Sequence, residues 1–116
     1  MYPLDVIKST KLAKKLGGPP IFNDGYLQHV LINADTVILD IKILAQNNPL
    51  LNNDTQVKLH LKKIHSIRFN TDSSDAYIMI IHDIDVRKEG NLLHLILESS
   101  LGEISEFIFE SIELND

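Results

Sequence analysis

The chain has 116 residues, contains no cysteine and carries a formal net charge of −5 at pH 7. This length fits one domain that buries a core without covalent staples. The lack of cysteine excludes disulfide frameworks and the common thiolate zinc sites. No basic region followed by an apolar stretch opens the chain, and no apolar run approaches the ~20 residues that a membrane span needs. We therefore expect a soluble, cytoplasmic protein without membrane contact.

The charge is distributed unevenly. Residues 89–116 contain seven acidic residues and no Lys or Arg, whereas residues 1–16 carry four Lys and one Asp. A negative field repels nucleic acid and attracts basic partners. Acidic side chains also serve as an ordinary solvated surface that keeps a protein soluble, and the composition leaves both interpretations open.

Apolar residues at roughly helical spacing predict a helix over residues 1–16, with Pro3 in a position that a first helical turn tolerates. The sequence Gly-Gly-Pro-Pro then ends the helix, and residues 17–25 form a turn. Several lysines of this segment share one helical face, which is typical of the solvated side of a helix packed on a sheet.

Alternating apolar residues predict strands over residues 26–33 and 36–44, and the short polar link between them predicts an antiparallel hairpin. The asparagine-rich stretch 45–56 is expected to be a loop with Leu50 and Leu51 tucked inward. A third strand begins at Val57. Its apolar phase slips near Lys62-Lys63, which predicts a bulge or a break into two strands.

Residues 76–86 form the most apolar stretch, because residues 77–81 are five consecutive large apolar side chains. Such a run predicts the central strand of the sheet, covered on both faces. A hairpin loop at 87–91, with Gly90 available for positive φ, leads into a strand over 92–98. The last strand spans 103–114, with a second bulge near Glu110-Ser111.

These patterns predict one α+β domain over residues 1–116. The N-terminal helix (1–16) and turn (17–25) are followed, over 26–116, by a curved, mostly antiparallel sheet of six to seven strands or an open barrel. Short connections without helices favour antiparallel pairing, and the chain has too few helices for a parallel βαβ arrangement.

Motifs for catalysis are largely missing. The chain lacks the G-x-S-x-G nucleophile motif and the glycine-rich phosphate loops. Its histidines are not at H-x-H or H-E-x-x-H spacing, so we predict no metal site, no cofactor and no catalytic residue. Asp83 and Asp85 lie two residues apart beside Arg87 and Lys88, which favours surface ion pairing over acid–base chemistry. The five histidines are His29, His60, His65, His82 and His94.

Residues 20–24, with the sequence Pro-Ile-Phe-Asn-Asp, precede the alternating strand over 26–31. This arrangement resembles the immunity protein 50 family of bacterial polymorphic toxin and contact-dependent growth inhibition systems. That family has a helical N-terminus, a Pro-x-Phe-His-Asp turn and then alternating strands; Asn23 stands here in place of the histidine. The resemblance implies that Phe22 plugs the junction of helix and sheet and that Asp24 caps the turn through its carboxylate.

Members of this family neutralise a toxin by binding it. The resemblance therefore implies a non-enzymatic, cytoplasmic immunity protein, a monomer or weak dimer, that covers the active site of a cognate basic toxin such as a nuclease. Its own ligand would be neither a nucleic acid nor a membrane. The candidate toxin-binding residues are carboxylates, with Glu106 and Glu110 expected on one outward strand face: Asp83, Asp85, Glu98, Glu103, Glu106 and Glu110.

Two other interpretations stay open. A β module that holds a small apolar ligand would use the central strand to line a cavity. A hydrolase would use the histidines together with Asp83 and Asp85.

Overall fold

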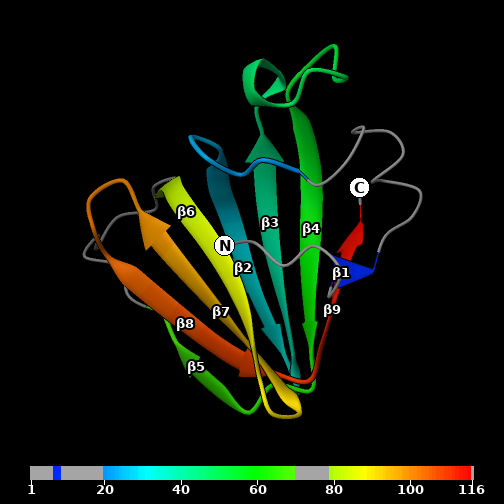
Figure 1. The fold of residues 1–116 in the computed structure, drawn as a ribbon, viewed down its shortest axis with the longest axis vertical. Helices are drawn as coiled ribbons and strands as arrows, with labels where there is room; N and C mark the ends of the chain where they lie inside the picture. The colour runs from blue at the N-terminus through cyan, green and yellow to red at the C-terminus, as the bar shows by residue number, and fades with distance from the viewer. Residues whose placement is uncertain (1–6, 9–19, 70–78, 116) are drawn as a thin grey trace.

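A computed structural model describes residues 7–8, 20–69 and 79–115, and the fold in these ranges is a bent β-sheet (Figure 1). Between two of the described strands lies the 3-10 helix η2 (Ala45–Asn47). The strands are β1 (Ile7–Lys8), β2 (Tyr26–Asn33), β3 (Thr36–Ile43), β4 (Thr55–Lys62), β5 (Ser66–Arg68), β6 (Met79–Glu89), β7 (Leu92–Ser99), β8 (Ile104–Phe109) and β9 (Ser111–Asn115).

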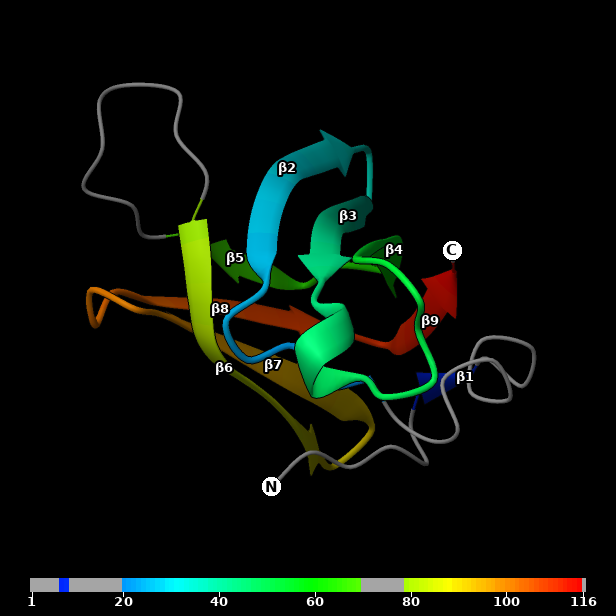
Figure 2. The ribbon, with the colours of Figure 1, turned by 90° about the horizontal axis from the view of Figure 1, so that it is seen from above.

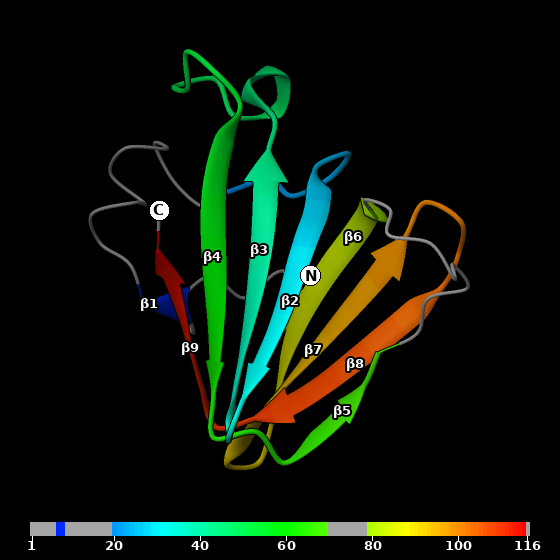
Figure 3. The ribbon, with the colours of Figure 1, turned by 180° about the vertical axis from the view of Figure 1, so that it is seen from behind.

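The strand order across the sheet is β1-β9-β4-β3-β2-β6-β7-β8-β5, and Figure 3 shows these strands side by side. Eight strands pair antiparallel, and the two-residue β1 pairs parallel with β9. Strands β2 and β6 pair through only two residue pairs. We call β2, β3, β4 and β9 the first half of the sheet, and β5 to β8 the second half.

The two halves are also joined by bends in two chain segments. Strands β4 and β5 are separated by residues 63–65, and β8 and β9 only by Glu110. Because β4 pairs with β9 while β5 pairs with β8, both segments cross from one half to the other. Figure 2 shows the strong curvature that results, and Figure 1 shows η2 and the loop after it at one end of β3 and β4.

The predicted α+β class is wrong. Ile7 and Lys8 form a strand that pairs with Ile112 and Glu113, which is incompatible with one helix over residues 1–16. Within the described ranges, the longest helix is the three-residue η2. A short isolated helix is marginally stable, whereas the edge of β9 offers backbone partners to a strand. The rest of the predicted helix and residues 17–19 of the predicted turn lie outside the described residues.

The predicted central strand is only half covered. Strand β6 does occupy an inner position, between β2 and β7. Met79 and Ile81 are buried, but Ile80 between them is 42% exposed. The apolar run therefore does not mark a strand buried on both faces, because Ile80 lies opposite Tyr26 on the outward side. Residues 76–78 lie outside the described ranges.

The β2–β3 hairpin turn, the positive φ of Gly90 and the two phase slips are confirmed, but residues 87–89 of the predicted hairpin loop belong to strand β6. The β2–β3 hairpin closes through Asn33 and Thr36. Strand β4 ends at Lys62, and Lys63 follows with a positive φ of 58°. Gly90 has a φ of 63° in the β6–β7 turn. The two predicted irregularities split two long strands into four, and together with β1 this explains why the sheet has nine strands instead of six or seven.

The core consists of the inward side chains of both halves. Burial alternates residue by residue along β3 and β7, as expected for strands with one wet face. Phe107 and Phe109 of β8 are fully buried. None of the described residues belongs to a helix long and apolar enough to cross a membrane. The inward residues with no exposed surface include Val37, Leu39, Ile41, Ile43, Val57, Leu59, Leu61, Ile81, Val86, Leu95 and Leu97.

Asparagines fasten the loop after η2 to the segment before β2. The amide of the buried Asn48 accepts a hydrogen bond from the Ile21 N–H (2.9 Å) and donates to the carbonyls of Ile21 (3.1 Å) and Leu44 (2.9 Å). Leu51 is tucked inward as predicted, but Leu50 is 62% exposed. The loop is therefore ordered by one polar side chain and one apolar side chain.

The turn before β2 contains Phe22 and Asp24, the two residues to which the family resemblance assigns structural roles. Phe22 is buried in the core. Asp24 has a φ of 66°, and its N–H, not its carboxylate, makes the structural contact, a 2.8 Å hydrogen bond to the carbonyl of Ile81. A Cβ at Gly25 would lie 2.6 Å from the Lys42 carbonyl oxygen, so the turn requires glycine there.

Candidate functional site

The outward face of the second half collects most of the predicted acidic residues. In the register of β6 and β7, Asp83 lies opposite Glu98 and Asp85 lies opposite Ile96. In the next strand pair, Ile96 lies opposite Glu106. The structure therefore brings four of the predicted acids onto one face of the adjacent strands β6, β7 and β8. They are Asp83, Asp85, Glu98 and Glu106.

Two of these four carboxylates are neutralised by their own chain. The Nε atom of Arg87 donates to Oδ2 of Asp85 over 2.7 Å, as the expected surface pairing requires. Burial raises the pKa of Asp85, but hydrogen bonds and positive charge, including those of Arg87, outweigh burial and hold the pKa below its usual 3.8. Glu106 pairs with Arg68 of β5. Neither carboxylate is available as a bare negative charge.

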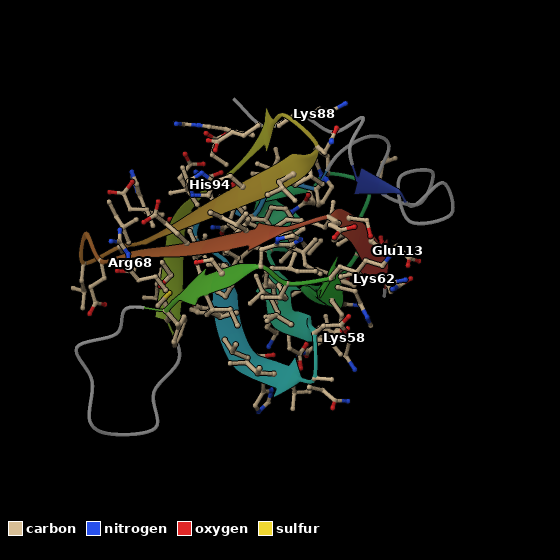
Figure 4. The ribbon with its side chains drawn as sticks, turned by 90° about the horizontal axis from the view of Figure 1, so that it is seen from below. Lys58, Lys62, Arg68, Lys88, His94 and Glu113 are labelled. Carbon is tan, nitrogen blue, oxygen red and sulfur yellow. The ribbon has the colours of Figure 1, made fainter. Side chains whose placement is uncertain are left out.

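His94 extends this network across three strands. Its Nε2 lies 3.1 Å from Oε1 of Glu106, and its Nδ1 lies 3.1 Å from Oε1 of Glu89. The His94 side chain is only 15% exposed. Figure 4 shows Arg68 and His94 on this half, whereas Lys62 and Glu113, another ion pair, lie together on the other half. The network holds the middle of the outward face together and leaves few free charges there.

The remaining predicted acids lie elsewhere. Glu110 sits in the bend between β8 and β9, where His65 contacts it at 2.9 Å; the hydrogen bond of His65 and the charge of Lys63 lower its pKa below the usual 4.5. Glu103 lies in the β7–β8 turn, where the Ser99 hydroxyl donates to its carboxylate over 3.3 Å. The bend separates Glu110 from Glu106, and each has its own cationic partner.

Asp83 and Glu98 differ from the other acids. Neither has an ion pair or a hydrogen bond to its side chain within the described ranges. They also face one another directly across β6 and β7, next to the bulge between Ile81 and Asp83. Like charges placed directly opposite in a sheet are destabilising. This pair is therefore the one acidic feature of the described face that the fold itself does not compensate.

Exposed apolar side chains surround this pair. Ile104 of β8 lies opposite Glu98 and is 43% exposed, and Leu101 in the adjoining turn is 70% exposed. The turn is tied to β6 because the Ser100 N–H donates to the Ile80 carbonyl over 2.9 Å. We call the set Ile80, Asp83, Glu98, Leu101 and Ile104 the acidic–apolar patch.

Sequence reasoning missed the three apolar members of the patch. One signal was present for Ile104, because it is out of phase with the buried Phe107 and Phe109. Leu101 stands alone between polar turn residues. The exposure of Ile80 had no such signal, because its neighbours in the sequence are equally apolar.

The histidines are dispersed and do not converge. His29 contacts Asp40 at 3.2 Å, and His65 and His94 contact other carboxylates in different places. In the part of the chain that the structure describes, no group of three or more His, Asp or Glu side chains is placed to hold a metal ion. Asp83 and Asp85 lie within β6, which continues to Glu89, three residues past the predicted strand end at 86.

Comparison with known proteins bears on the fold alone. No protein-family model and no curated protein sequence matches the chain. A solved structure described as an uncharacterized protein from Neisseria gonorrhoeae superimposes with a TM-score of 0.58, covering 83% of this chain and 94% of that chain. The two sequences are 15% identical. A natural protein thus shares the bent-sheet architecture.

Proposed function

We propose that this chain is a non-enzymatic binding protein whose acidic–apolar patch contacts a basic protein. In the specific form suggested by the resemblance to the immunity protein 50 family, that partner is a bacterial toxin domain such as a nuclease. The chain would neutralise the toxin in the cytoplasm by covering its active site.

The observation that carries this proposal is the uncompensated pair Asp83 and Glu98. Asp85 and Glu106 are neutralised by cations of the same chain. Asp83 and Glu98 lie opposite each other without such a cation among the described residues, so their repulsion lowers the stability of the fold. A cationic side chain of a partner, placed between the two carboxylates, would remove the repulsion and add two ion pairs. The pair thus favours a basic partner over an acidic or neutral one.

The apolar members of the patch give the contact its second component. Protein interfaces combine an apolar centre with a polar rim, and Leu101 and Ile104 supply exposed apolar surface beside the carboxylates. Charge mainly accelerates association, whereas burial of apolar side chains mainly slows dissociation. The two kinds of residue should therefore affect different rate constants.

The test uses the protein that the reading frame next to this chain's gene encodes. We would measure its association and dissociation rates with the parent and with Glu98→Gln, across a range of ionic strengths. Glu113→Gln is the matched control, because it removes the same charge from the other half of the sheet. At low salt, Glu98→Gln should slow association about tenfold and Glu113→Gln much less, because steering depends on where the charge lies. Ile104→Ser should raise the dissociation rate several-fold.

Two outcomes count against the proposal at different levels. Equal association rates for Glu98→Gln and Glu113→Gln at low salt would mean that the patch is not the contact surface. A neighbouring protein that forms no complex with the parent, and whose toxicity in cells the parent does not relieve, would refute the immunity role itself.

A further inference from the structure

His94 lies between two carboxylates that come from different strands. Its Nδ1 is 3.1 Å from Oε1 of Glu89, at the end of β6, and its Nε2 is 3.1 Å from Oε1 of Glu106, on β8. The imidazole belongs to β7, between these two strands, and the His94 side chain is 15% exposed. One ring therefore bridges three neighbouring strands of the second half.

The two contacts of this ring depend on its protonation state. A carboxylate oxygen only accepts hydrogen bonds, so a ring nitrogen must carry a proton to bond with it. An imidazolium carries a proton on both nitrogens, whereas a neutral imidazole carries one on a single nitrogen. The arrangement around His94 is therefore that of the charged ring. Loss of one proton would leave one of the two carboxylates facing a bare nitrogen.

Charged side chains of three other strands surround the ring. Arg87 lies directly opposite His94 in the register of β6 and β7, but its guanidinium is bound to Asp85 over 2.7 Å. The positive charge of Arg87 is thus compensated within β6 and does not replace the charge of the ring. The described charged groups around His94 are Asp85, Arg87 and Glu89 of β6, Glu106 of β8 and Arg68 of β5.

The two glutamates should respond differently when the ring becomes neutral. Glu106 is 27% exposed, and Arg68 binds its second carboxylate oxygen. Glu89 is 59% exposed, and within the described ranges its only cationic partner is His94. An unsatisfied carboxylate costs more free energy where water reaches it less. The remaining proton should therefore stay on Nε2, toward Glu106, and Glu89 should turn to water.

We propose that His94 is a pH-dependent clasp, which joins Glu89 at the end of β6 to Glu106 of β8 while its ring is charged. When the ring loses its proton, the contact with Glu89 opens and the outward face gains one uncompensated negative charge. Histidine is the side chain whose charge ordinarily changes between about pH 5 and 8. The stabilisation by the clasp is present at the acidic end of this range and is lost as the pH rises.

Nuclear magnetic resonance titration of the histidine ring signals tests the clasp. Each contacting carboxylate favours the charged ring, so Glu89→Gln and Glu106→Gln should each lower the titration midpoint of His94 by about half a pH unit. Glu98→Gln is the matched control, because it removes the same charge from the same face of β7 without a contact to the ring, and it should shift the midpoint much less. An unchanged midpoint in either of the first two variants, or an equal shift in the control, would overturn the proposal.

Urea unfolding at several pH values tests whether the clasp stabilises the fold. The parent should unfold at a higher urea concentration than His94→Gln at pH 5.5, and this difference should shrink toward pH 8 because the ring loses its charge. In Glu89→Gln the same substitution should give a smaller pH dependence, since one contact is already gone. Circular dichroism checks that each variant is folded. A difference that stays constant between the two pH values would overturn the proposal.

Discussion

The opposed carboxylates of Asp83 and Glu98 predict a protein that becomes more stable when either charge is removed. Directly opposite side chains in an antiparallel sheet have Cβ atoms about 5 Å apart. Two unit charges about 6 Å apart in water repel by about 0.7 kcal/mol. Screening at physiological ionic strength, with a Debye length of about 8 Å, roughly halves this energy. Asp83→Asn and Glu98→Gln should therefore each stabilise the fold by about 0.3–0.7 kcal/mol.

A double-mutant cycle isolates this energy from other effects of the substitutions. The free energy of unfolding is measured by urea titration for the parent, Asp83→Asn, Glu98→Gln and the double variant. The second substitution should add almost nothing to the first, because the repulsion is already gone. The coupling should be largest at low salt and should vanish at about 1 M salt, where the Debye length is about 3 Å.

The control for this cycle is Glu113→Gln, which removes an acid paired with Lys62 and should not stabilise the fold. Additive stability changes at low salt, or a coupling energy that does not change with salt, would refute the reasoning. The carboxylates would then be held apart or neutralised in some other way, and a cationic partner would relieve no repulsion at this place.

Two further predictions concern the stability of the fold, through the buried amide of Asn48 and the ion pair of Asp85 with Arg87. Asn48→Ala should lower the free energy of unfolding by about 2–4 kcal/mol, because it leaves buried backbone groups of Ile21 and Leu44 without partners; a change in the urea midpoint worth less than about 1 kcal/mol would contradict this role. Asp85→Asn should be less stable than the parent at neutral pH by about 1 kcal/mol or less, since Arg87 is largely exposed. Because the pKa of folded Asp85 lies below 3.8, this stabilisation is present above that pH and is lost as the pH falls through the folded pKa. The difference in the free energy of unfolding between the parent and Asp85→Asn should therefore narrow on acidification. A difference that does not change with pH would contradict a stabilising ion pair between Asp85 and Arg87.

Local patterns predicted the fold where one period dominates a long segment. The alternation of residues 36–43 identified β3 because every second side chain is buried. The phase slips at Lys62 and Glu110 located the two bends. The N-terminal segment was misassigned because its apolar spacing fits a helix loosely, while the partner that makes Ile7 and Lys8 a strand lies more than a hundred residues away in β9.

The candidate site was predictable in composition but not in electrostatics. The sequence shows which residues are acidic, but the partners that neutralise them come from distant segments. Arg68 and Glu106 are 38 residues apart, His65 and Glu110 are 45 apart, and Lys62 and Glu113 are 51 apart. Only the strand register shows which carboxylates are left uncompensated, and it selects Asp83 and Glu98 from the six candidates.

The position of β9 has a consequence for folding during synthesis. Strand β9 lies between β1 and β4, so the last described strand completes the half of the sheet that begins near the N-terminus. A nascent chain cannot make this pairing until residue 115 has left the ribosome, and until then the edge of β4 is unpaired. Pairings between residues so far apart in the sequence are slow to form, and exposed edges favour aggregation meanwhile. Emergence of β9 from the ribosome, not that of the β2–β3 hairpin, should therefore be the step at which this half of the sheet acquires its protease resistance.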